Sequence, residues 1–136
     1  MNAQDHHDIR LLTVAEAAQD SAAKTVQLPS ETDPLTLAGA LAGVERIELH
    51  FPKFSDGRAF SQAWLLRRRL GFQGDIRATG DVLLDQLLQM QRTGFSSAVL
   101  RADQDIGHAR VLLSRFTEGF YQGDVSRPQP HFDVVS

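Results

Sequence analysis

Short runs of β-forming residues alternate with longer stretches of helical periodicity from Lys24 onward, and this alternation is the strongest constraint on the fold. A strand, a helix and a second strand in succession form a βα unit, whose two strands lie parallel in one sheet. At 136 residues the chain has the length of one average domain. We therefore predict an α/β fold, a single three-layer domain with a mainly parallel sheet of successive βα units.

The predicted strands are short apolar or alternating runs bounded by turn residues. They cover residues 25–28, 46–51, 75–78 and 95–100. The run 46–51 alternates apolar with polar residues, which predicts a strand with one polar face that lies at a sheet edge or under a partner. Residues 9–14 are a further candidate strand, and residues 15–23 form a helix or a linker.

The predicted helices begin at capping residues and end at glycine. Asp33 and Pro34 open one that Gly43 ends, and Ser55 or Asp56 caps one that runs from about Gly57 to Leu70 and ends at Gly71. A third follows the turn 79–81 and ends at Gly94, and a fourth, capped by Asp103 or Asp105, carries Ile106, Ala109, Leu113 and Phe116 on one face.

These elements divide the chain into three parts. Residues 1–23 are a variable N-terminal segment, residues 24–120 are the α/β domain, and residues 121–136 are a C-terminal arm or tail with two prolines and little apolar content.

Charge and composition exclude several classes of protein. The formal charge is −3, and residues 1–42 hold six acidic and two basic side chains, so a nucleic-acid-binding surface is not expected. No apolar stretch is long enough to cross a membrane, and the acidic start is no secretory signal, so we expect a cytoplasmic protein. The absence of cysteine excludes thiol chemistry, disulfides and Cys-ligated metal centres.

Motifs for metals and cofactors are also missing from the sequence. The five histidines show no HxxxH or HExxH spacing, and no GxGxxG or GxxxxGK[ST] run follows a strand. We expect neither a metal nor a cofactor. Twelve of the fourteen basic residues are Arg, and the run 67–69 is interpreted as a solvated helix face.

An Arg and an Asp lie near or just after the end of each of three predicted strands. In an open parallel sheet, ligands bind beyond the carboxyl ends of the strands. One interpretation is an anion pocket in which Arg58, Arg77 and Arg101 converge while Asp56, Asp81 and Asp103 orient them. The alternative is that each Asp caps a helix and each Arg pairs with a neighbouring cap.

Asp85 and Gln86 are also candidates for this site. Asp81 and Asp85 are four residues apart on a predicted helix, where their charges repel unless a cation lies between them. Arg58, Arg77 or an Arg of a partner would supply that cation. A pair of carboxylates acting as acid and base is the alternative.

The helix predicted at 57–70 has two adjoining apolar stripes, wider than one sheet face requires. Phe60 and Trp64 form the second stripe. We expect it to pack on a neighbour, as a homodimer or on a partner enzyme.

Several blocks in the middle of the chain resemble a bacterial family, the domains of unknown function numbered nine-three-four. The resemblance adds nothing for residues 1–42, and it rests on blocks that occur in the family's order: Phe51–Arg58, Arg67–Gly71, Gly74–Val82, Asp85–Gln86, Arg92–Phe95 and Phe120–Gln122. Thr93 stands where many members of the family have Cys, which argues against a thiol chemistry common to the family at this position.

The resemblance implies a role in sulfur metabolism. Genes of the family commonly stand beside the gene for the sulfite reductase haemoprotein, and members are labelled oxidoreductases without an established reaction. We therefore expect an accessory or anion-binding protein of assimilatory sulfate or sulfite reduction, without a redox centre, whose partners are sulfite reductase or an oxyanion. The alternatives are a cofactor-free enzyme of sulfur metabolism that uses Asp81 or Asp85 with an Arg, and a structural homodimer with no small ligand.

Overall fold

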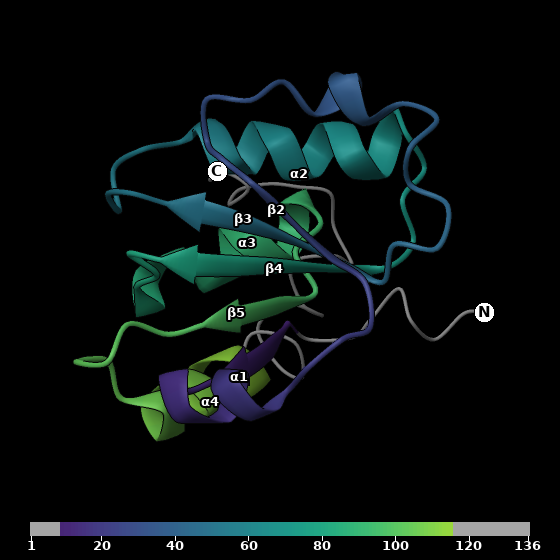
Figure 1. Cartoon of the computed structure of the whole chain (residues 1–136). Helices are drawn as coiled ribbons and strands as arrows, with labels where there is room; N and C mark the ends of the chain where they lie inside the picture. The colour runs from purple at the N-terminus through teal and green to yellow at the C-terminus, as the bar shows by residue number, and fades with distance from the viewer. Residues whose placement is uncertain (1–8, 116–136) are drawn as a thin grey trace. The chain divides into compact units, whose positions relative to one another are not determined.

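A five-stranded, all-parallel sheet forms the centre of the fold (Figure 1). The computed structural model describes residues 9–115. The strands lie in the order β1-β5-β4-β3-β2. Their bounds are β1 Arg10–Leu12, β2 Thr25–Leu28, β3 Arg46–Phe51, β4 Asp75–Gly80 and β5 Ser97–Val99. The predicted α/β class, with a parallel sheet of βα units, is confirmed.

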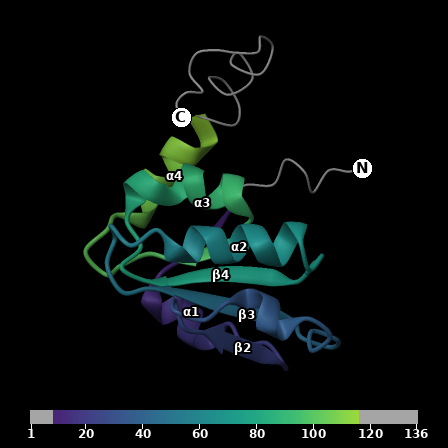
Figure 2. The same ribbon diagram turned by 90° about the horizontal axis from the view of Figure 1, so that it is seen from above.

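Helices flank both faces of this sheet. The helices are α1 Val14–Gln19, α2 Arg58–Arg68, α3 Leu87–Thr93 and α4 Ile106–Arg115, with single 3-10 turns η2 Pro34–Leu37 and η3 Leu84–Gln86. Figure 2 shows α2 and α3 on one face and α1 on the other. The strand order explains this division. From β2 to β5 each strand lies beside the previous one, whereas the connection from β1 to β2 crosses the whole sheet in the opposite direction. Right-handed crossovers in opposite directions lie on opposite faces of a sheet.

The chain divides into two compact units. The sheet, α1, α2, α3 and both 3-10 turns lie within Ile9–Ile106. From Gly107 onward the chain belongs to the other unit, which includes nearly all of α4. Phe116 and the tail predicted at 121–136 lie outside the described residues.

The hydrophobic core fills the space between the sheet and α2. The odd-numbered side chains of β3 point toward α2, because the ring of Phe51 lies 5.1 Å from the ring of Phe60 and 5.8 Å from that of Phe95. Opposite them, α2 buries small and aliphatic residues that allow a close approach: Ala59, Ala63 and Leu66. Phe60 is therefore half-buried and packs against two core rings, while Trp64 on the same predicted stripe is 43% exposed.

The ends of several elements differ from the prediction. β4 continues through Gly80 instead of ending at residue 78, and the strand predicted at 95–100 forms ladder pairs only over 97–99. β1 lies in the segment 1–23, which the sequence analysis separated from the α/β domain, yet it pairs with β5 and completes the sheet. This pairing joins segments far apart in the chain, so local sequence signals do not reveal it.

The helix predicted from Pro34 to Gly43 is a single 3-10 turn. Asp33 caps it as expected, with its carboxylate 2.9 Å from the Leu35 amide. The backbone leaves the helical conformation at Ala38, and Gly39 follows with a φ of 83°. Glycine adopts this left-handed conformation without steric cost, so the turn ends early.

The ends predicted for α2 and α3 agree with the structure. Gly71 and Gly94 both have positive φ, and the Gly94 amide donates to carbonyls of the last turn of α3. At the start of α2 the N-cap is Gly57, and Asp56 accepts from the Arg58 amide at 3.0 Å.

Candidate functional site

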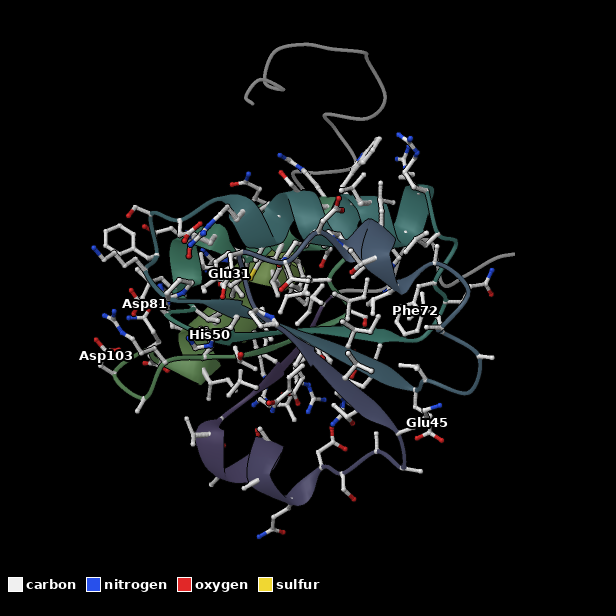
Figure 3. The ribbon with its side chains drawn as sticks, turned by 45° about the horizontal axis from the view of Figure 1, so that its top comes forward. Glu31, Glu45, His50, Phe72, Asp81 and Asp103 are labelled. Atoms are coloured by element: carbon white, nitrogen blue, oxygen red, sulfur yellow. The ribbon has the colours of Figure 1, made fainter. Side chains whose placement is uncertain are left out.

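The loops that follow β3, β4 and β5 meet at one edge of the sheet. The Asp81 amide donates to the Phe51 carbonyl at 2.8 Å, and the Arg101 amide donates to the Val82 carbonyl at 3.1 Å. Figure 3 shows Asp81 and Asp103 at the same end of the strands as His50. We call these loops, residues 52–58, 81–83 and 100–105, the carboxyl edge; Arg58 is also the first residue of α2.

Arg101 lies between two carboxylates at this edge. Its Nη1 is 2.6 Å from Asp81 Oδ1, while its Nε and Nη2 lie 2.7 and 2.8 Å from the two oxygens of Asp103. Hydrogen bonds from Arg101 lower the pKa of Asp103 to about 2 and hold the pKa of Asp81 below 3.8. Both carboxylates are therefore ionised at neutral pH, and they raise the pKa of Arg101 in turn.

Arg58 pairs with Asp56 in the neighbouring loop. Its Nε lies 3.0 and 3.1 Å from the two carboxylate oxygens, and its Nη2 lies 2.5 Å from Oδ2. These contacts lower the pKa of Asp56 to about 2. The Arg58 guanidinium thus binds the carboxylate of Asp56, two residues away, as the interpretation of local pairing predicted.

Phe54 is held at the edge by two predicted site residues. Its amide donates to Asp81 Oδ2 at 2.8 Å, and its carbonyl accepts from Gln86 Nε2 at 2.5 Å. Its side chain is nevertheless 53% exposed. An apolar ring on a backbone tethered from both sides is a feature that the sequence analysis missed, and the only local signal was an aromatic residue inside a polar loop.

Asp85 does not pair with Asp81. The predicted helix through both residues is absent: Asp81 lies in the turn after β4, and Asp85 is exposed in η3. The helical spacing of four residues therefore never forms, and the Asp81 carboxylate faces Arg101 and Phe54 instead.

Arg77 is separated from Arg58 and Arg101 and lies inside the fold. It sits within β4 and is 1% exposed. Its Nη2 lies 2.6 Å from Asp20 Oδ2 at the end of α1, and its Nε lies 2.8 Å from Ser97 Oγ. The three arginines of the predicted anion pocket therefore do not converge. The sequence placed Arg77 at the strand end because it ended β4 too early.

Arg77 belongs to a polar network between the sheet and α1. Asp20 also accepts from Arg10 at 2.5 Å and from Arg46 at 3.3 Å, and Arg46 Nε lies 3.0 Å from Asp75. The hydrogen bond from Arg77 is the largest cause that lowers the pKa of Asp20. The sequence analysis missed this network, since it depends on the sheet register that aligns Arg46 with Asp75 and Arg77 with Ser97.

Asp75 is charged despite its burial. Burial by itself raises its pKa, but hydrogen bonds from Ser96, Ser97 and Arg46 outweigh that effect and leave the pKa below 3.8. Charged and hydrogen-bonded on several sides, Asp75 serves the fold.

Arg67 also has a structural role, in contrast to the solvated face predicted for 67–69. Its guanidinium donates to the carbonyls of Gly94, Phe72 and Gly74 at 2.9, 2.9 and 2.7 Å. Burial lowers its pKa. It thereby fastens the ends of α2 and α3 to each other, while Arg68 and Arg69 are exposed.

His50 and Thr79 lie beside the carboxyl edge on the face that carries α1. His50 Nδ1 is 3.3 Å from Thr79 Oγ1. Gly80 has a φ of 92°, and a Cβ there would collide with the Phe51 carbonyl and the His50 ring. The close approach of β3 and β4 at this point therefore requires glycine.

Charged side chains of the carboxyl edge pair with one another. Its two arginines already bind carboxylates, and Asp56, Asp81 and Asp103 are ionised, so none of these three is a proton donor at neutral pH. Residues 9–115 contain no group of three or more His, Asp or Glu side chains placed to hold a metal. Within the same residues, no helix is both long and apolar enough to cross a bilayer.

Comparison with known proteins assigns the chain to a family. No curated protein and no solved structure matches it. Residues 25–132 match the family described as "Bacterial protein of unknown function (DUF934)". This match covers most of the chain, including β2 to β5 and the three loops of the carboxyl edge. The chain therefore belongs to the DUF934 family, as its central sequence blocks indicated.

Proposed function

We propose that the protein is an accessory, partner-binding component of assimilatory sulfite reduction, without a redox centre of its own. The observation that carries the binding role is Phe54, an aromatic side chain that is 53% exposed while Asp81 and Gln86 hold its backbone in place. A preorganised aromatic anchor loses little conformational entropy on binding, and exposed aromatic residues are enriched at the centres of protein interfaces.

The ion pairs around Phe54 fit a protein partner better than a small oxyanion. A sulfite or sulfate ion at this edge would have to displace Asp81 or Asp103 from Arg101, or Asp56 from Arg58. A protein surface can instead contact Phe54 and leave these pairs intact. The acid–base alternative lacks a protonated carboxyl group at Asp81, whose pKa is held low.

The place in sulfite reduction rests on the gene neighbourhood that the resemblance implies. It makes the sulfite reductase haemoprotein the first partner to test. Isothermal titration calorimetry of the full chain with the purified haemoprotein should give saturable binding, and Phe54→Ser should weaken it by about ten-fold or more. Val14→Ser is the matched control, because Val14 is 56% exposed at the start of α1.

Three outcomes of this titration would contradict the proposal. Failure of the wild-type chain to bind the haemoprotein would remove the role in sulfite reduction. Equal losses for Phe54→Ser and Val14→Ser would remove Phe54 as the anchor. Stoichiometric binding of free sulfite or sulfate that Arg101→Gln abolishes would favour the oxyanion site instead.

A further inference from the structure

The arginines at the ends of α2 and α3 differ from every arginine at the carboxyl edge. Arg68, Arg69 and Arg92 are exposed, and within residues 9–115 none of them forms an ion pair. Arg58 and Arg101, in contrast, each bind a carboxylate. Within residues 9–106, the exposed arginines that form no ion pair therefore lie at the ends of these two helices.

The fold brings these three arginines to one end of the molecule's sheet unit. Arg67 donates to the Gly94 carbonyl, so the last turn of α2 lies against the last turn of α3. Both helices run back from the carboxyl ends of the strands toward their amino ends. Figure 3 shows Phe72, just after α2, at the opposite end from Asp81 and Asp103. Glu45 lies at this end too, where its carboxylate accepts from the Ala23 amide.

An exposed tryptophan adjoins the unpaired cations. Trp64 lies one helical turn before Arg68, is 43% exposed, and has the Arg68 guanidinium 5.7 Å from its ring centroid. Tryptophan and arginine are the residue types most enriched among those that dominate binding energy at protein interfaces. A stacked guanidinium keeps its edge N–H groups free to donate to carboxylates.

Complementing the helix dipole does not account for this surface. A basic residue in the last turn of a helix stabilises that helix, which explains Arg68 and Arg92 individually. It does not explain an exposed Trp64 beside them. A second copy of the chain is also a poor occupant, because a two-fold contact through Trp64 would bring the unpaired arginines of both copies together.

We propose that Trp64, Arg68, Arg69 and Arg92 form a docking surface for an acidic protein surface. We call it the α2–α3 basic surface. The partner would offer Asp or Glu side chains to the three guanidiniums and an apolar contact to the indole ring. This surface is distinct from the Phe54 loop, so the inference stands or falls independently of the proposed function.

Trp64 supplies a site-specific signal, because it is the one tryptophan of the chain. We would titrate the full chain with a short oligo-glutamate peptide at low salt and follow tryptophan emission. The expected result is a saturable change whose apparent affinity falls as salt is added. The combined variant Arg68→Gln, Arg69→Gln, Arg92→Gln should bind about ten-fold more weakly or not at all, and Lys replacements should restore part of the affinity.

Two further variants test whether the response comes from this surface. Lys53→Gln also removes one positive charge from an exposed position, at the opposite end of the sheet, and should leave the titration unchanged. Trp64→Phe, followed by calorimetry, should weaken binding if the indole ring contacts the peptide. Circular dichroism should show the wild-type fold in every variant, because the altered side chains are exposed.

Several outcomes would overturn the inference. These are an unchanged tryptophan emission in the wild-type titration, wild-type affinity in the triple Gln variant, or an equal loss in Lys53→Gln. A saturable response to free sulfate at matched ionic strength, equal to that of the peptide, would indicate a small-anion site and overturn docking as well. Loss of haemoprotein binding in Phe54→Ser bears on the proposed function alone.

Discussion

Burial determines how much an individual arginine of this chain contributes to stability. Arg77 is 1% exposed and binds Asp20, Asp75 and Ser97, whereas the Arg58 side chain is 54% exposed and binds Asp56. An ion pair in solvent contributes little to stability, but removing one partner from a buried pair leaves an uncompensated charge. Arg77 therefore stabilises the fold, whereas Arg58 forms a surface ion pair that contributes little to stability.

We expect Arg77→Ala to lower the free energy of unfolding by about 3 kcal/mol. Asp20 and Asp75 would lose a charged partner, and the buried stem of Arg77 would leave a gap in the sheet face. Urea unfolding followed by circular dichroism measures the change. Arg58→Ala is the control and should unfold at the wild-type midpoint; similar shifts in both variants would contradict the buried network.

The two carboxylates of this network predict acid sensitivity. The pKa values of Asp20 and Asp75 in the folded protein lie below 3.8, so below about pH 4 the unfolded chain binds more protons than the folded one. Their stabilising contribution is complete above that pH and is lost as pH falls through the folded pKa values. Unfolding free energies measured between pH 6 and pH 2 should therefore fall at the acid end.

The Asp75→Asn variant measures how much of this acid sensitivity is due to Asp75. The variant should be less stable than wild type at pH 6, and its stability should depend less steeply on pH in the acid range. A pH profile parallel to that of wild type would show that Asp75 does not titrate differently in the two states.

At the scale of elements, glycines fix where strands and helices end. Gly94 ends α3 as its left-handed C-cap, and Gly71 has a positive φ in the turn two residues after the C-cap of α2. Gly80 serves a further purpose, because β3 and β4 approach closely there: the space that a Cβ would occupy is taken by the Phe51 carbonyl and the His50 ring.

Gly80→Ala should destabilise the protein by about 1–3 kcal/mol, through both the positive φ and the collision. Gly39→Ala is a matched control, since Gly39 has a φ of 83° with no atom near the position of a Cβ. The difference between their denaturant midpoints isolates the collision. If Gly39→Ala costs as much as Gly80→Ala, the close approach of β3 and β4 contributes nothing.

At the scale of the whole molecule, charge is separated within the sheet unit. The carboxyl edge holds ionised carboxylates with their arginines paired, and the ends of α2 and α3 hold unpaired arginines. This separation bears on the homodimer predicted from the apolar stripes of the helix at 57–70. A dimer through that helix would have to overcome the repulsion between the basic surfaces of two copies.

We therefore expect the emission of Trp64 to be independent of protein concentration at low salt. Light scattering on the same samples reports whether the chain forms a dimer at all. A dimer accompanied by a change in tryptophan emission would place the interface on α2 and contradict the repulsion argument. A dimer without that change would place the interface on another surface, such as the outer edge of β1 or β2.

Local sequence signals predicted the strands of this fold and several ends of its helical segments. Alternation within 46–51 marked β3 and its polar face, and Asp33, Gly71 and Gly94 marked where helical segments begin or end. These signals are local: they depend on side-chain periodicity and backbone preferences over a few residues. The pairing of Arg58 with Asp56 is equally local and followed from the sequence as one of two interpretations.

Which charged residues are buried and which are exposed depends on how the elements pack, and local sequence signals do not show it. Asp20 reaches Arg77 across 57 residues of chain, because the crossover from β1 to β2 carries α1 over the sheet face. Arg67 is fastened to Gly94 while Arg68, its neighbour, stays exposed, because α3 packs against one side of α2. Such partners depend on register, strand order and helix packing, so residue types and spacings along the chain do not specify them.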